Sequence, residues 1–220
     1  MIKPLIVLSV ACSWAFLSVA AFSAQTVELK SLPDLSHENS MQHGAEAVLS
    51  TCLLCHSLKY IRYGHLKDIG LDEVKIGNYR GERSEHDSLL SAMDDAVRQA
   101  AYGIVPPDLS LMTKTRKHGQ RYVYSLLTGF YTNEQGDTEN HIFPGIRMPD
   151  ALGYSYADDE TARAKLEQQA YDIVTFLEWA ADPKAQERHT LGYYVLGYLT
   201  VLTVMLYFLK RKVWRRLSKA

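Results

Sequence analysis

Apolar residues recur at helical spacing over several segments of this chain, whereas the alternation expected of strands is scarce. The clearest segment is 161–181, where one apolar face is formed by Leu166, Ala170, Ile173, Val174, Leu177 and Ala181. Pro183 should end this helix, because proline lacks the amide hydrogen that a helix interior needs. Three further helices are expected: one from about Glu38 into Cys52, one over 88–101, and one over 120–128 with Gly129 as its carboxy-terminal cap. The pattern predicts a mostly α domain with long loops.

The first 24 residues form an apolar segment that is typical of a secretory signal peptide. Lys3 precedes the apolar run, and small residues follow it, so cleavage is expected between residues 21 and 24. A lipoprotein anchored through Cys12 is an alternative, although the apolar run continues well past that cysteine.

A second apolar run, 191–209, has 19 residues without a charge. As a helix it would span about 28 Å, close to the thickness of a bilayer core. A buried core helix is the alternative, but tyrosines near its ends and a cationic segment beyond it are typical of membrane anchoring. We therefore expect a transmembrane helix over 190–210 and a basic cytoplasmic tail over 211–220.

The segment between these runs, 25–189, has the room for one medium domain, and it is acidic. It contains 17 Lys and Arg against all 25 Asp and Glu, about −8 in net charge, although the whole chain carries only −1. Six basic residues lie in the last eleven. Because positive charge marks the cytoplasmic side, the acidic domain is expected in the periplasm of a bacterium, tethered to the inner membrane.

Two of the three cysteines, Cys52 and Cys55, lie in this domain and are separated by two residues. Such a pair is compatible with a redox disulfide, half of a zinc site, or attachment of a c-type haem. His56 follows at once, as haem attachment requires: both thiols form thioethers and the histidine ligates iron. No second cysteine pair completes a zinc site, and no strand and helix pattern of a thioredoxin surrounds the motif. One covalent haem c is the favoured interpretation.

The sixth position of the iron decides between electron transfer and small-molecule chemistry. The candidate ligands in the domain are Met41, Met93, Met112 and Met148, with His118 and His141 as rivals. Met148 differs from the other methionines because it lies in a loop fixed by prolines on both sides, Pro144 and Pro149. Ordinary packing remains the alternative for any methionine.

At this point the chain resembles the cytochrome c1 family, the haem subunits of the quinol to cytochrome c reductase called the cytochrome bc1 complex. The resemblance covers nearly all of the domain and its membrane helix. It rests on five motifs in order: Cys52-Leu53-Leu54-Cys55-His56, Pro106-Pro107-Asp108-Leu109-Ser110, Tyr124-Ser125-Leu126-Leu127-Thr128-Gly129, Met148-Pro149, and Phe176-Leu177-Glu178-Trp179-Ala180-Ala181 with Pro183.

The resemblance implies a cytochrome c-like fold in which His56 and Met148 are the two iron ligands. It further implies that Arg116 lies beside a haem propionate and Tyr122 near the haem edge. The residues that it implies for the pocket lining are Pro107, Leu109, Leu126 and Ile146. Without the resemblance, Arg116 would be interpreted as one solvated charge in the basic run 114–117.

The resemblance also implies the function: no catalysis by this chain alone, but one electron accepted from a Rieske iron–sulfur protein and passed to a soluble or tethered cytochrome c. The implied partners are cytochrome b and the Rieske protein, within a dimeric complex in the membrane. No nucleic acid is expected as a partner. Two alternatives are a membrane-tethered cytochrome that serves another oxidase or reductase, and a haem enzyme such as a peroxidase, which would need an open iron position.

Overall fold

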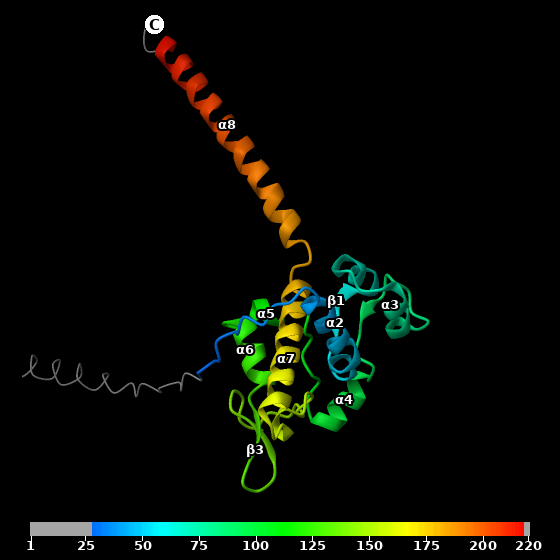
Figure 1. Ribbon diagram of the computed structural model, residues 1–220. Helices are drawn as coiled ribbons and strands as arrows, with labels where there is room; N and C mark the ends of the chain where they lie inside the picture. The colour runs from blue at the N-terminus through cyan, green and yellow to red at the C-terminus, as the bar shows by residue number, and fades with distance from the viewer. Residues whose placement is uncertain (1–27, 218–220) are drawn as a thin grey trace, which may run out of the picture.

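The computed structural model describes residues 28–217. The expected signal peptide lies outside the described residues. A small domain is followed by one long helix, α8, which extends away from it (Figure 1). The helices are α2 (Ser40–Ser50), α3 (Glu73–Arg80), α4 (Asp95–Tyr102), α5 (Met112–Thr115), α6 (Gly119–Leu127), α7 (Glu160–Ala180) and α8 (Ala185–Leu217), with 3-10 turns at η1 (Cys52–Leu54), η2 (Tyr63–Ile69) and η3 (Tyr154–Tyr156). The mostly α prediction is confirmed.

The centre of the domain is the contact between α2 and α7. The helix expected over 161–181 is α7, and Ala170, Ile173 and Leu177 are buried on the face that the spacing predicted. Its first turn is capped by Asp159, whose carboxylate accepts a hydrogen bond from the amide of Ala162 at 2.7 Å. The helix ends before Pro183, as expected.

The two helices approach each other most closely at Gly44 of α2. A Cβ atom at this position would lie 1.9 Å from the backbone carbonyl oxygen of Asp172 on α7, so no larger residue fits. The buried apolar residues of α2, Ala45, Val48 and Leu49, complete the contact. This contact fixes the end of α2, and with it the cysteine segment that follows at once.

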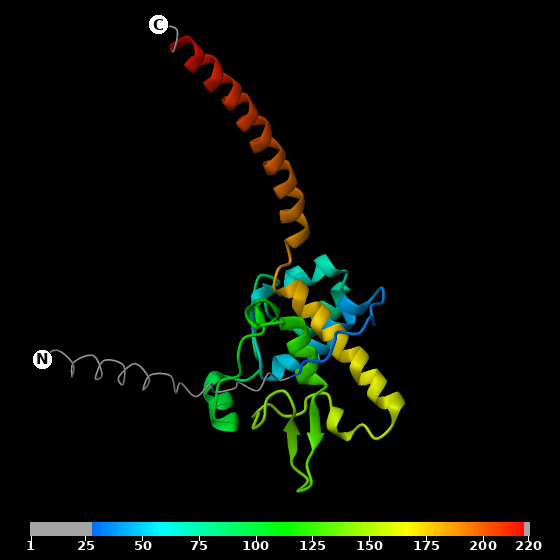
Figure 2. The same ribbon diagram turned by 90° about the vertical axis from the view of Figure 1, so that its left-hand side faces the viewer.

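Two short antiparallel pairs of strands accompany the helices. β1 (Leu58–Arg62) pairs with β2 (Ser88–Leu89), and β3 (Phe130–Thr132) pairs with β4 (Thr138–Asn140). The β3–β4 hairpin lies at the end of the domain away from α8 (Figure 2).

Two expected helix details are wrong. The helix expected over 88–101 begins only at Asp95, because Ser88 and Leu89 pair with β1, and this pairing buries Leu89 completely. Gly129 does not cap α6: the cap is Thr128, whose hydroxyl bonds the carbonyl of Tyr124 at 2.9 Å. A Cβ at Gly129 would instead lie 2.6 Å from the Ser125 carbonyl oxygen, so close packing explains this glycine.

Among residues 28–217, α8 is the helix that is long and apolar enough to cross a membrane. Its leucines, valines and tyrosines are exposed over the span, as lipid-facing side chains would be. The expected apolar helix is therefore present, and it is longer than 190–210 at both ends. It begins at Ala185, just after Pro183, and continues through Lys210, since cations near a helix carboxy terminus are favourable.

Candidate haem-binding site

The cysteine motif forms a tight turn directly after α2. The amides of Cys55 and His56 both donate hydrogen bonds to the carbonyl of Cys52, at 3.1 and 2.8 Å. Both cysteines are free thiols and half-buried. The motif therefore presents two thiols and an imidazole from a single turn, as haem attachment requires.

The ring of His56 is held by the backbone of a distant segment. Its Nδ1 atom lies 2.7 Å from the carbonyl oxygen of Pro107. A carbonyl can only accept a hydrogen bond, so Nδ1 carries the proton and Nε2 keeps its lone pair. Burial lowers the pKa of His56, the Pro107 carbonyl opposes that shift, Arg98 lowers the pKa further and Asp108 raises it, with a net decrease. The neutral ring with a free Nε2 is the form that binds a metal.

The segment around Pro107, which supplies this carbonyl, is held against β1 by hydrogen bonds. Asp108 contributes most, because its two carboxylate oxygens accept from the amides of Lys59 and Ser110, both at 2.9 Å. Two more hydrogen bonds extend the contact, from the Leu109 amide to the Ser57 carbonyl at 2.8 Å and from the Tyr60 amide to the Ser110 hydroxyl at 3.1 Å. Of the predicted pocket residues, Pro107 and Leu109 thus lie beside the motif.

Two residues of α4 contact Cys55. The buried Arg98 donates from its guanidinium to the Cys55 carbonyl at 2.8 Å and also pairs with Asp95. The Tyr102 hydroxyl lies 3.3 Å from the Cys55 sulfur. Sequence reasoning missed both Arg98 and Tyr102, since nothing local links α4 to a cysteine more than 40 residues earlier.

The loop that contains Met148 contacts α4, the helix that also contacts Cys55. Arg147 donates to the carbonyl of Tyr102 at 3.2 Å, and Met148 is partly buried against the main hydrophobic core. Cys55, Tyr102 and Arg147 therefore form a continuous series of contacts that ends beside Met148.

The remaining predicted residues lie on or near α6. The buried Asn140 joins Leu126 to the start of the Met148 loop: it donates to the Leu126 carbonyl at 2.8 Å and accepts from the amides of Ile142 and Phe143 at 2.9 and 3.2 Å. Asn140 was also missed, because its partners lie on two separate segments. Ile146 is half-buried in the same loop.

Arg116 and Tyr122 form a pair of their own. The guanidinium carbon of Arg116 lies 5.8 Å from the centroid of the Tyr122 ring, within the range of a cation–π contact. Arg116 is exposed, whereas Tyr122 packs against the core. No hydrogen bond, ion pair or ring contact among the described residues joins this pair to His56.

Large apolar side chains around the motif fit a flat, apolar cofactor. Four of them are exposed to water although they adjoin site residues in the sequence: Leu54 (50%), Ile104 (53%), Val105 (37%) and Phe143 (52%). Exposed apolar side chains that flank the cysteine motif, Pro107 and the Met148 loop in the sequence are of the kind that a porphyrin would cover. The residues present therefore fit the predicted haem c.

Comparison with known proteins shows the family of this chain. The Cytochrome C1 family matches residues 80–217, which begin after the cysteine motif. Cytochrome c1 of Allochromatium vinosum is 32% identical over 83% of this chain and 86% of its own length, and cytochrome c1 of Rhodospirillum rubrum is 32% identical over 80% of each chain. A protein named ammonia monooxygenase gamma subunit, from Nitrosomonas europaea, is 29% identical over 90% of this chain and 92% of its own length.

The family match covers more than half of the chain, and each of the two bacterial cytochromes c1 is similar over at least 80% of it. The mostly α fold is the one that the resemblance implied, and the long apolar helix that the sequence predicted is present. This chain belongs to the cytochrome c1 family.

Proposed function

We propose that this chain is the haem-bearing electron-transfer subunit of a membrane quinol to cytochrome c reductase. It would accept one electron at a time from a Rieske iron–sulfur protein and pass it to a cytochrome c. The observation that carries the proposal is the orientation of His56 by the Pro107 carbonyl, in a chain of the cytochrome c1 family. Quinol oxidation would belong to other subunits, so this chain alone would catalyse no reaction.

The proposed residue roles follow from the donor atoms at the site. Cys52 and Cys55 would hold one haem c by thioether bonds, and His56 and Met148 would bind its iron. When bound, the haem supplies one-electron chemistry at iron, with a reduction potential that a thioether ligand raises. His56 would act through Nε2 while Pro107 fixes its tautomer, and the exposed apolar residues around the motif would exclude water from the haem face.

The proposed partners and topology rest on the family and on the membrane helix. A relative named cytochrome b/c1, from Bradyrhizobium diazoefficiens, is 28% identical over 80% of this chain, which spans 33% of that protein. That name supports cytochrome b as a partner here. The Rieske protein as the electron donor and a dimeric complex as the assembly rest on the family resemblance. The haem domain would face the periplasm, with the end of α8 in the cytoplasm.

The visible spectrum of the full-length, haem-loaded protein tests the iron ligands. The native protein should show the weak red band that sulfur ligation gives to oxidised haem, and it should not bind carbon monoxide when reduced. Met148→Ala should lose that band and bind carbon monoxide. Met41→Ala is the matched control, because Met41 is also partly buried against the core but lies on α2. A native protein that already binds carbon monoxide would favour the haem-enzyme alternative.

Purification from membranes in mild detergent tests the assembly. A fixed subunit should leave the membrane together with cytochrome b and a Rieske protein. A free membrane-tethered carrier should be recovered alone. Recovery with an ammonia-oxidising complex would favour the function named for the Nitrosomonas relative.

A further inference from the structure

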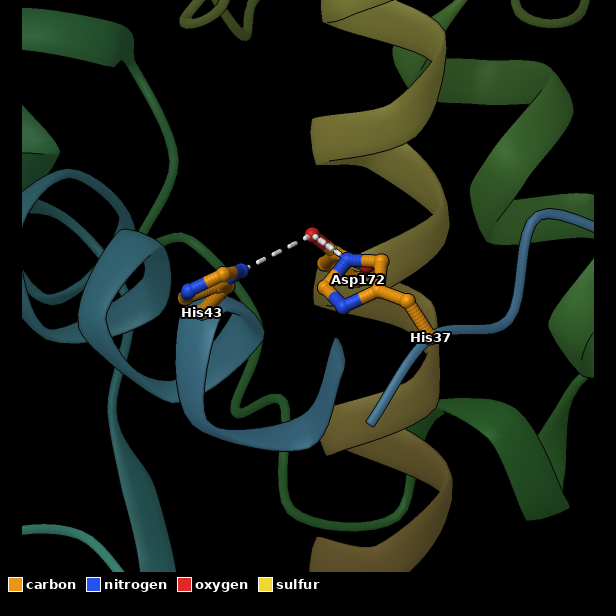
Figure 3. A group of neighbouring side chains, drawn as sticks. All are labelled: His37, His43 and Asp172. Atoms are coloured by element: carbon orange, nitrogen blue, oxygen red, sulfur yellow. Dashed lines mark hydrogen bonds and ion pairs between the residues drawn. The ribbon is translucent and has the colours of Figure 1, made fainter. Parts of the chain in front are cut away.

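Two imidazoles and one carboxylate converge where α2 and the segment before it meet α7 (Figure 3). His37 lies just before α2, His43 lies on α2, and Asp172 lies on α7. The Nε2 atom of His37 is 3.2 Å from Oδ1 and 3.3 Å from Oδ2 of Asp172, and the Nδ1 atom of His43 is 3.9 Å from Oδ2. One ligand atom from each residue lies within 4.8 Å of the others.

We propose that His37, His43 and Asp172 form a binding site for a first-row divalent metal ion of the zinc type, separate from the haem. Two nitrogens and one carboxylate oxygen suit zinc and its neighbours, whereas calcium and magnesium prefer sites made of oxygen alone. In a tetrahedral zinc site with bonds of about 2.0–2.1 Å, neighbouring ligand atoms lie about 3.3 Å apart. The His37 to Asp172 distance already has that value, whereas the exposed His43 ring, now 3.9 Å from the carboxylate, would have to move closer to bind the same ion.

The carboxylate is placed and oriented by its surroundings. Asp172 is 4% exposed, and Gln168 on the same helix donates to its Oδ1 at 2.9 Å while also donating to the Leu35 carbonyl at 3.0 Å. Outer hydrogen bonds of this kind orient the ligands of metal sites. The carboxylate therefore has a fixed direction toward the two imidazoles.

The two histidines are held by the backbone. The amide of His37 donates to the hydroxyl of the buried Ser40 at 3.1 Å, and the Ser40 amide donates to the His37 carbonyl at 3.1 Å. His43 precedes Gly44, where α2 touches the backbone of Asp172. The imidazoles are brought to the carboxylate by the packing that also supports the cysteine turn.

A fourth position for the metal is available beside the carboxylate. An open surface hollow of about 380 Å³ borders His43 and Asp172, and its wall includes Glu46, Ser50, Tyr79 and Lys165. It is large enough to hold water, which commonly completes a zinc site with three protein ligands. A metal here would join the segment before α2, α2 itself and α7, and so would stabilise the packing that holds Cys52.

Zinc titration of the full-length, haem-loaded protein in detergent, followed by calorimetry, tests the site. Haem loading matters because free thiols at Cys52 and Cys55 would themselves bind zinc. We expect one Zn²⁺ per chain and a rise in the thermal midpoint of the haem domain on zinc binding. His37→Gln and His43→Gln should each weaken binding by at least about tenfold, the lower end of the loss seen when an outer residue of a metal site is removed.

His86→Gln is the control, because His86 is exposed on a segment remote in sequence from the three ligands. It should leave zinc binding unchanged, and the haem spectrum should be native in all three variants. Full zinc affinity in either His37→Gln or His43→Gln would overturn the proposal, as would the absence of zinc binding to the native chain. In that event His37 and Asp172 form only a hydrogen-bonded pair.

Discussion

The Nδ1 atom of His56 lies 2.7 Å from the carbonyl oxygen of Pro107, and the two residues are 51 positions apart in the chain. This contact fixes the tautomer of the proposed iron ligand. It depends on the segment around Pro107 staying in place against β1, and Asp108 provides two of the hydrogen bonds that keep it there.

Removing the Asp108 carboxylate should therefore loosen the support of His56. In Asp108→Ala, the amides of Lys59 and Ser110 lose their acceptors, and we expect the free energy of unfolding to fall by about 1–2 kcal/mol. Denaturant titration of the haem-loaded protein measures the loss. Asp137→Ala, in the exposed turn between β3 and β4, should change stability little. Equal stability of the two variants would show that the Asp108 carboxylate does not stabilise the packing of the Pro107 segment against β1.

Substitution of the buried Arg98 should strongly lower the free energy of unfolding. Arg98→Met removes the hydrogen bond to the Cys55 carbonyl and leaves that carbonyl without its charged donor, so we expect a loss of about 2–3 kcal/mol. Asp95→Ala removes only the exposed partner of Arg98 and keeps the hydrogen bond to the Cys55 carbonyl, so we expect a smaller loss. Thermal unfolding of both variants distinguishes the two contacts. A larger loss in Asp95→Ala would contradict this assignment.

The comparison of α7 with α4 shows how far the sequence predicts this fold. The ends of α7 follow the predicted range within one residue, because a long apolar face and a proline stop are local signals. The first residues of the helix expected over 88–101 form a strand instead, since their partner lies about 30 positions earlier in β1. Local periodicity carries no information about such a partner.

For the site too, local patterns were predicted and contacts between remote segments were not. The cysteine turn was predicted from spacing alone, and Met148 from its prolines together with the family resemblance. The contacts of Arg98, Tyr102 and Asn140 each join segments that are remote in the sequence, so no local pattern marks them. Whether Arg116 meets a propionate stays a prediction, because Arg116 contacts Tyr122 in the described chain.

The ion pair between Lys114 and Glu178 should make stability depend on acidic pH. Burial alone raises the pKa of Glu178, but hydrogen bonds from Lys114, Thr113 and Gln120 outweigh it and hold the pKa below 4.5. A carboxyl group with a depressed folded pKa stabilises the protein fully above its unfolded pKa, and that stabilisation is lost as the pH falls through the folded pKa.

Glu178→Gln should accordingly be less stable than the native chain at neutral pH, by about 1 kcal/mol, and the difference should shrink as the pH falls below 4.5. Denaturation at a series of pH values measures both. Glu187→Gln is the control, because its pair with Lys184 is exposed on both sides. A difference that persists unchanged at low pH would mean that the charge of Glu178 is not what stabilises the contact.

Acidic residues before and at the start of α7 should steer a basic cytochrome c if the proposed electron transfer is correct. Asp158 and Glu160 are exposed, whereas Asp159 also caps the helix. The double variant Asp158→Asn with Glu160→Gln should slow association several-fold at low ionic strength and match the native rate at high salt. Stopped-flow electron transfer to cytochrome c measures the rate.

The matched control for steering neutralises the same number of exposed acids elsewhere, at Asp68 and Glu82. It should change the rate less than the Asp158 and Glu160 variant does. If both double variants slow association equally, only the overall negative charge of the domain matters, and no docking surface at the start of α7 is needed.

The close approach of α2 and α7 should make Gly44 intolerant of any side chain. In Gly44→Ala the new methyl group would lie 1.9 Å from the Asp172 carbonyl oxygen, so the helices must separate. We expect the free energy of unfolding to fall by about 3 kcal/mol, with poorer haem incorporation.

Gly77→Ala on α3 is the matched control, since no atom lies within 4 Å of the added Cβ. It should be neutral or stabilising by about 0.5–1 kcal/mol, because alanine loses less backbone entropy in a helix. Denaturant unfolding and the haem content per chain measure both variants. A native-like Gly44→Ala protein would show that α2 shifts on α7 without cost, and the cysteine turn would then need another support.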